Sequence, residues 1–193
     1  MQISKKIIGL IVLVVAILIT ACIILVQTNK TPEKSITSQP HASPTPGVIS
    51  DTVISMQAAS QELVANQPSK INILVDAGTN EFSGAQFTLT YDPKVLENVK
   101  VTPGTYLQSP SELWNVVDPV KGTIAYTLAM SPGSNPSTGK GVLAVISYSV
   151  VPGTTASETT IGVDQSNAGV SDWRIKSSVL KSISGTTISL HSQ

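Results

Sequence analysis

Residues 83–91, SGAQFTLTY, decide the fold class of this chain. From Ala85 to Tyr91 every second side chain is apolar, and the side chains between them are polar or small. Because successive side chains of a β-strand point to opposite faces, this alternation predicts a strand with one buried face and one exposed face. Residues 122–130, GTIAYTLAM, repeat the pattern. We expect the apolar rows of both segments, Tyr91 included, to lie in a core.

Shorter alternating runs extend the pattern along the chain, at residues 71–75, 142–151 and 186–190. Asp-Pro and Pro-Gly pairs, which favour turns, separate the runs. Tyr148 falls on an apolar row and is expected in the core. Residues 56–66 contain several helix-forming residues, but Pro68 follows closely, so we expect a strand and a turn there. Many short strands without a long helical pattern predict an all-β sandwich.

The composition excludes several classes of function. Charged residues make up 12% of the 193 residues, and residues 51–193 carry 11 acidic and 8 basic side chains, a net charge of −3. So weak and acidic a balance does not suit nucleic-acid binding. The two histidines, His41 and His191, lie outside the predicted strands, and Cys22 is the only cysteine. Because the predicted strands contain neither histidine nor cysteine, and nothing in the sequence fixes two carboxylates at the separation that glycoside hydrolysis needs, we expect no enzyme activity, no metal and no cofactor.

An uncharged run near the N-terminus, residues 7–26, follows Lys5 and Lys6. At about 1.5 Å per residue a helix of this length spans roughly 30 Å, the thickness of the hydrocarbon core of a bilayer. The two lysines favour a cytoplasmic N-terminus. We therefore expect residues 1–6 in the cytoplasm, a single transmembrane helix at 7–26 and the rest of the chain outside the cell membrane.

A lipoprotein signal is the alternative anchor. Residues 19–22, ITAC, resemble a bacterial lipobox, in which the chain is cut before the cysteine and the thiol of Cys22 is lipidated. Residues 23–26, IILV, continue the apolar run past Cys22, which favours an uncleaved helix. Both alternatives tether the rest of the chain to the extracytoplasmic side of the membrane.

Residues 27–50, QTNKTPEKSITSQPHASPTPGVIS, have the composition of a linker. Proline, serine and threonine dominate, and the segment has too few large apolar residues to offset the entropy of ordering. Prolines stiffen such a segment, which at about 3.1 Å per residue reaches up to roughly 70 Å. We expect the folded domain to occupy residues 51–193.

Several segments in order along this domain resemble the cohesin domain of cellulosomal scaffolds. They are 87–97 (FTLTYDPKVLE), 101–104 (VTPG), 122–124 (GTI), 141–148 (GVLAVISY) and 185–190 (GTTISL). The resemblance implies a nine-stranded jelly-roll β-sandwich related to the family 2 and family 3 carbohydrate-binding modules. With the N-terminal segment, the expected architecture is one transmembrane helix, a linker and an all-β cohesin-like domain.

The resemblance also implies a binding face for a partner. In cohesins of the first type, one sheet face binds the helical dockerin module of an enzyme. Carried over by position, this face consists of outward residues on two strands and one asparagine: Gly84, Gln86, Thr88, Thr123, Ala125, Thr127 and Asn115. Many first-type cohesins carry Asn and Asp where this chain has Gly84 and Gln86, so this platform is less polar than theirs.

Three functions are compatible with these observations. The first is a non-catalytic, membrane-anchored surface adaptor that binds a protein partner, such as a dockerin-bearing polysaccharide-degrading enzyme. The second is a carbohydrate-binding module active in polysaccharide binding or catabolism, in which exposed rings of Tyr106, Trp114 and Trp173 stack on a glycan. The third is a structural surface protein without a specific ligand.

Overall fold

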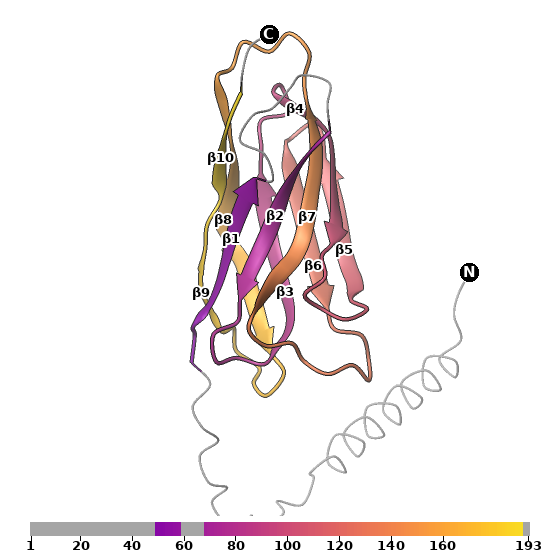
Figure 1. Cartoon of the computed structure of the whole chain (residues 1–193), viewed down its shortest axis with the longest axis vertical. Helices are drawn as coiled ribbons and strands as arrows, with labels where there is room; N and C mark the ends of the chain where they lie inside the picture. Colours follow the sequence, from indigo (N-terminus) through magenta and orange to yellow (C-terminus); the bar gives the residue numbers. More distant parts are fainter. Residues whose placement is uncertain (1–48, 59–67, 191–193) are drawn as a thin grey trace, which may run out of the picture. The chain divides into compact units, whose positions relative to one another are not determined.

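The computed structural model describes residues 49–58 and 68–190, and these form a β-sandwich of two sheets (Figure 1). The described part contains ten strands: β1 (Thr52–Ala58), β2 (Ser69–Asp76), β3 (Phe82–Thr90), β4 (Leu96–Pro103), β5 (Ser111–Asp118), β6 (Thr123–Ala129), β7 (Lys140–Val150), β8 (Glu158–Asp172), β9 (Leu180–Ile183) and β10 (Thr186–Ser189). No residue of this part is helical, so the predicted all-β sandwich is confirmed.

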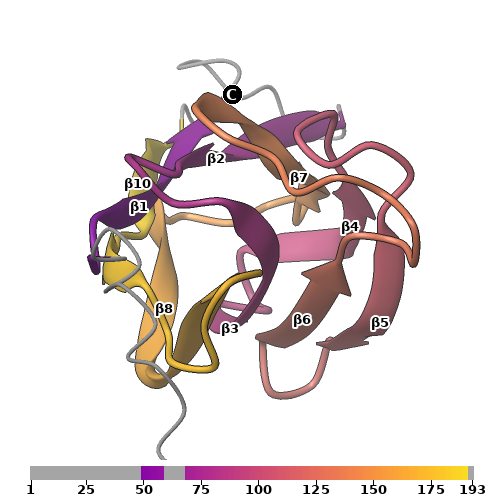
Figure 2. The ribbon, with the colours of Figure 1, turned by 90° about the horizontal axis from the view of Figure 1, so that it is seen from below.

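The two sheets hold five strands each. One has the order β4-β7-β2-β1-β9, and the other has the order β10-β8-β3-β6-β5. Figure 2 shows the two layers from one end of the strands. Neighbouring strands are antiparallel except β1 and β9, which run parallel.

The apolar rows predicted from the alternation meet between the sheets. Phe87 of β3 and Tyr126 of β6 are 1% exposed, and their ring centroids lie 5.6 Å apart. Ile71, Ile73 and Ile146 close the core from the other sheet. Tyr91 and Tyr148 are also buried, as expected.

The expected number of nine strands is wrong, because the chain changes sheet within its last segment. β9 pairs with β1 in one sheet, and β10 pairs with β8 in the other. Gly185 lies at the crossing, where an added Cβ would come within 2.0 Å of the carbonyl oxygen of Ile161. Only a residue without a side chain allows the backbone to pass so closely.

Several expectations concern residues outside the described part. These are the cytoplasmic residues 1–6, the transmembrane helix at 7–26, the lipobox with Cys22, and the linker apart from its last two residues. The strand expected within 56–66 is present up to Ala58, where β1 ends, and residues 59–66 are not described. Within 49–58 and 68–190, no helix is long and apolar enough to cross a membrane.

Candidate functional site

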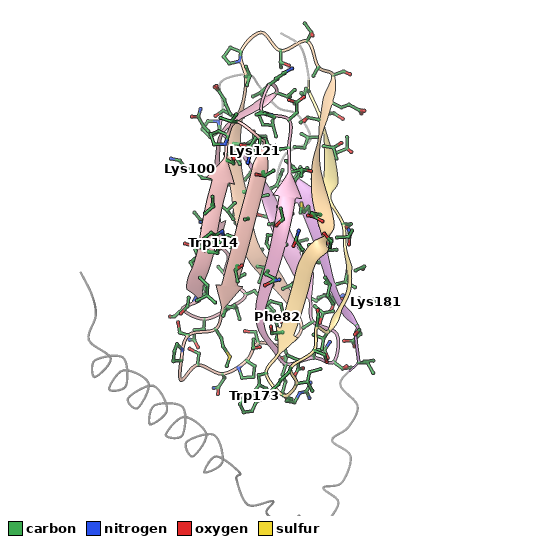
Figure 3. All side chains as sticks on the ribbon, turned by 180° about the vertical axis from the view of Figure 1, so that it is seen from behind. Phe82, Lys100, Trp114, Lys121, Trp173 and Lys181 are labelled. Carbon is green, nitrogen blue, oxygen red and sulfur yellow. The ribbon has the colours of Figure 1, made fainter. Side chains whose placement is uncertain are left out.

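The outward side chains of β8, β3, β6 and β5 form one continuous surface, here called the four-strand face (Figure 3). The strand register arranges them in four rows: Ser171–Gly84–Ala129–Ser111, Gly169–Gln86–Thr127–Trp114, Asp164–Thr88–Ala125–Val116 and Gly162–Thr90–Thr123–Asp118. Six of the seven predicted platform residues lie together in these rows: Gly84, Gln86, Thr88, Thr123, Ala125 and Thr127.

Asn115, the seventh predicted residue, lies on the opposite side of the sheet. It pairs with Tyr126, whose ring is buried between the sheets, so both side chains point away from the four-strand face. The Asn115 side-chain amide donates to the carbonyl oxygen of Val101 in β4 and to Glu112 Oε2, each at 2.9 Å. Asn115 therefore connects the edges of the two sheets and does not contribute to the platform.

The four-strand face is hollowed where its side chains are smallest. A groove of about 350 Å³ lies over the first two rows. Its floor includes Gly84, Gly169 and Ala129, and its sides are formed by Leu113 of β5 and by residues 176–178 after β8. A Cβ added at Gly84 would meet the carbonyl oxygen of Leu128 at 2.9 Å, whereas at Gly169 nothing lies nearer than 3.7 Å.

Exposed apolar side chains lie along β5, and one of them, Leu113, lines the groove. Leu113 is 62% exposed, Trp114 59% and Val116 47%. A bulge between Glu112 and Trp114 interrupts the strand register, and both Leu113 and Trp114 are left exposed. Adjacent exposed apolar residues of this size are characteristic of interaction surfaces. Sequence reasoning missed Leu113 and Val116 because an apolar run around a tryptophan is as compatible with burial as with exposure.

A fixed carboxylate carries the only charge in the two central rows. Asp164 Oδ1 accepts hydrogen bonds from the backbone N–H of Ser166 at 3.0 Å and from its hydroxyl at 2.6 Å, and Oδ2 accepts from the Asn167 amide at 2.7 Å. These bonds, that of the Ser166 hydroxyl foremost, lower the pKa of Asp164. Asp164 thus presents a negative charge beside Thr88.

The loop after β8 is held by an ion-paired network. Asp172 is 1% exposed, and its Oδ2 accepts from Arg174 Nη2 at 2.6 Å and from the backbone N–H of Glu81 at 2.8 Å. The Arg174 guanidinium holds the pKa of Asp172 at about 2. Arg174 Nη1 also lies 3.6 Å from Glu81 Oε1. The network fixes the loop whose residues 176–178 form one side of the groove.

The three aromatic residues considered for glycan stacking do not form one platform. Trp173, in the loop after β8, is 60% exposed, and Trp114 is exposed on β5. Tyr106 is half-buried, with its ring edge-on to Phe82 at a centroid distance of 5.3 Å, and burial raises its pKa to about 12. Tyr106 therefore belongs with the core, and two exposed indoles remain.

In the part of the chain that the structure covers, no group of three or more His, Cys, Asp or Glu side chains could hold a metal ion. The candidate site thus consists of a nearly uncharged sheet face, a shallow groove with a glycine floor and a border of exposed apolar side chains. Such an arrangement can bind another molecule by surface complementarity.

Solved structures share this fold at low sequence identity. A type II cohesin domain from the cellulosome of Acetivibrio cellulolyticus has a TM-score of 0.57 and 20% identity, over 71% of this chain and 94% of that one. The seventh ScaB type I cohesin from Pseudobacteroides cellulosolvens has a TM-score of 0.60 and 16% identity, over 74% and 93%.

A third similar structure is a type I cohesin–dockerin complex from Clostridium thermocellum, with a TM-score of 0.60 and 15% identity over 78% of this chain and 98% of that one. No curated protein matches the chain. The family model of the cohesin domain matches residues 65–188, most of the chain. The resemblance noted in the sequence is thereby confirmed, and the chain belongs to the cohesin domain family.

Proposed function

We propose that this cohesin domain is a non-catalytic adaptor that binds a dockerin module through the four-strand face. The single observation that carries the proposal is the character of this face, which is continuous, nearly uncharged and bordered by exposed Leu113, Trp114 and Val116. The comparisons add support, because one similar cohesin is solved as a complex with a dockerin.

The physical properties of the face suit a helical partner. Apart from Gln86, the side chains of β3 and β6 on this face are glycine, alanine and threonine, so a helix backbone can approach the sheet closely. Interface energy concentrates in a few buried anchors, most often tryptophan, tyrosine and arginine. Trp114, more than half exposed in the free domain, is the anchor that a partner would cover.

We further propose that residues 7–26 hold the chain in the cell membrane and that the segment 27–50 displays the domain outside. The uncharged run after Lys5 and Lys6 supports this placement. Protease treatment of intact cells should release the domain, and the mass of the membrane-bound chain should correspond to a chain that still carries residues 1–21 and an unmodified Cys22. A membrane-bound chain that begins at a lipidated Cys22 would show that the anchor is a lipid and not a helix.

The binding proposal is tested with the full-length chain in mild detergent and a panel of dockerin modules in calcium buffer. The panel contains those encoded in the same genome and, for reference, the dockerin of the similar complex from Clostridium thermocellum. Calorimetry should detect at least one dockerin with a dissociation constant below about 1 μM, near −8 kcal/mol. Failure of every dockerin to bind at ten times that concentration would contradict the proposal.

Polysaccharide binding is a second candidate, favoured by the exposure of Trp114 and Trp173. Exposed indole rings stack on sugar rings with a large contact area and little loss of side-chain entropy. Electrophoresis of the domain in gels that contain cellulose or xylan tests this function. Retardation that disappears in the double variant Trp114→Ala, Trp173→Ala would support it, and unchanged mobility in both gels would exclude it.

A further inference from the structure

We infer that the groove on the four-strand face receives one large apolar side chain of the partner helix, and that a carboxylate next to this side chain pairs with Lys176. The inference rests on the proposed function and adds the chemistry that the partner must present. It follows from the shape, the lining and the charge of the groove.

The shape of the groove comes from three small residues in neighbouring rows. Gly84 pairs with Ala129, and Gly169 pairs with Gln86 in the next row. Leu113 forms one side of the groove, and the loop at residues 176–178 forms the other. A volume of about 350 Å³ is at the small end of the range for ligand pockets. It suits an inserted side chain better than a polymer that runs along the sheet.

Among polar lining residues such as Ser177 and Ser178, one exposed apolar side chain, Leu113, favours an apolar occupant. Leu113, which forms one side, is 62% exposed to solvent in the free domain. Burial of apolar surface contributes about 25 cal/mol per Å². Because a side chain seated against Leu113 also covers surface on the partner, an aliphatic or aromatic residue gains most from the groove.

The charge of the groove favours an acidic neighbour. Lys176 is the only charged residue among those that line it. The ion pairs of the described residues engage Lys121, Lys140 and Arg174, and Lys176 takes part in none of them. A cation that has no ion-pair partner among the described residues can be complemented by an anion across the interface. A carboxylate about one helical turn from the inserted side chain would supply it.

Gly169 offers a way to fill the groove without disturbing the fold. A Cβ at this position finds its nearest atoms, Ser178 Oγ and Gln86 Cγ, at 3.7 and 3.8 Å, which are ordinary contacts. Gly169→Leu should therefore fold and occupy the groove with its own side chain. The matched control is Thr160→Leu, an exposed position of the same strand that lies beside β10.

Calorimetry measures the dissociation constant between the full-length chain in detergent and the dockerin of the panel that binds it most tightly. Gly169→Leu should weaken binding by at least about tenfold, which corresponds to about 1.4 kcal/mol. Thr160→Leu should bind as the unaltered chain does. Circular dichroism should show the same folded spectrum for all three proteins.

The variant Lys176→Glu tests the proposed ion pair with the partner carboxylate. Lys181→Glu on β9 is the control, because it changes the net charge of the chain by the same amount. We expect about fivefold weaker binding for Lys176→Glu at low salt, the size of an exposed ion pair, and a smaller difference at 1 M salt. Exchange of the partner carboxylate for lysine should restore the affinity of Lys176→Glu. Lys181→Glu should bind as the unaltered chain does.

The outcomes separate this inference from the proposed function. If a dockerin binds and both Gly169→Leu and Lys176→Glu retain full affinity, the groove is not used and the inference fails, while the proposed function stands. If no dockerin binds, both fail. If polygalacturonate binds and both variants lose it, the occupant is an acidic glycan, and the inference is again overturned.

Discussion

The inner and outer rows of β3 and β6 differ in what constrains them, although they belong to the same two strands. On the inner row, Phe87, Leu89, Ile124 and Tyr126 are at most 1% exposed and pack against the second sheet. Apart from Gln86, the outer row carries small or hydroxylated side chains such as Thr127, in contact with solvent. Because successive residues of a strand point to opposite faces, alternate residues of β3 and β6 serve the core and the outer surface.

This difference leads to three predictions that test whether the two rows are independent, and a fourth prediction concerns the buried carboxylate of Asp172. An inner-row change should affect stability, and an outer-row change should affect binding alone. Any variant that affects both identifies a residue where the separation fails. Stability refers throughout to the free energy of unfolding of the full-length chain in mild detergent.

The largest effect is expected on the inner row, for Phe87→Ala. Phe87 is 1% exposed and its ring lies 5.6 Å from that of Tyr126, so truncation leaves a cavity in the core. The free energy of unfolding should decrease by about 3–5 kcal/mol. Urea denaturation followed by circular dichroism measures it. A loss below about 1 kcal/mol would show that the two sheets do not depend on this contact.

The next effect is expected on the outer row, for Thr127→Arg. Thr127 lies between Gln86 and Trp114 near the centre of the four-strand face, and a cation placed there would be desolvated under the partner. Dockerin binding should weaken by roughly 30-fold, or about 2 kcal/mol. The free energy of unfolding should stay within about 0.5 kcal/mol. Thr160→Arg on β8 is the control, and equal losses in both variants would contradict a localised site.

A smaller effect is expected at Gly84, which lies on the binding face and is also packed against the backbone of β6. A Cβ there would lie 2.9 Å from the carbonyl oxygen of Leu128, so Gly84→Ala forces the neighbouring strand to move. Stability should decrease by about 1 kcal/mol. Gly169→Ala, where the added Cβ has 3.7 Å of room, should leave stability unchanged. If Gly84→Ala and Gly169→Ala are equally stable, the sheet accommodates the added methyl group at Gly84 without loss of stability.

The last prediction concerns the pH dependence of stability that is contributed by Asp172, the only charged residue among the buried ones of the described part. Its pKa is lowered from 3.8 to about 2 by Arg174, so the folded state favours the ionised form. This stabilisation is complete above pH 4 and is lost as the pH falls from about 4 to about 2. The stability difference between the unaltered chain and Asp172→Asn should narrow in this window. If the stability difference between the two proteins does not change with pH, the ion pair of Asp172 with Arg174 does not stabilise the fold.

The sequence was sufficient for strands in which only one face is buried. β3 and β6 alternate strictly, and both were predicted with the correct inward and outward residues. β5 does not alternate in this way, because Leu113, Trp114 and Val116 are all exposed and a bulge interrupts the register. β9 has four residues, which are too few for a periodic pattern.

Residues of the candidate site could be predicted where the strand that carries them has a regular alternating pattern. Residues from β3 and β6 were assigned to the correct face, since parity along a regular strand fixes direction. Asn115 was taken from the resemblance alone, without a strand pattern to fix its direction, and in the structure it pairs with Tyr126 and points to the other side of the sheet. The groove could not be predicted, since Gly169 and Lys176 join it only through the fold of β8 and its loop.

The hydrogen bond from Asn115 to Val101 affects how readily copies of the domain associate through the edges of their sheets. β4 and β5 are the terminal strands of their sheets, and unpaired terminal strands invite additional strands from neighbouring molecules. The asparagine amide occupies a main-chain acceptor that an incoming strand would need. This bond leaves one fewer open acceptor on the edge of β4, which makes the addition of a strand from a neighbouring molecule less favourable.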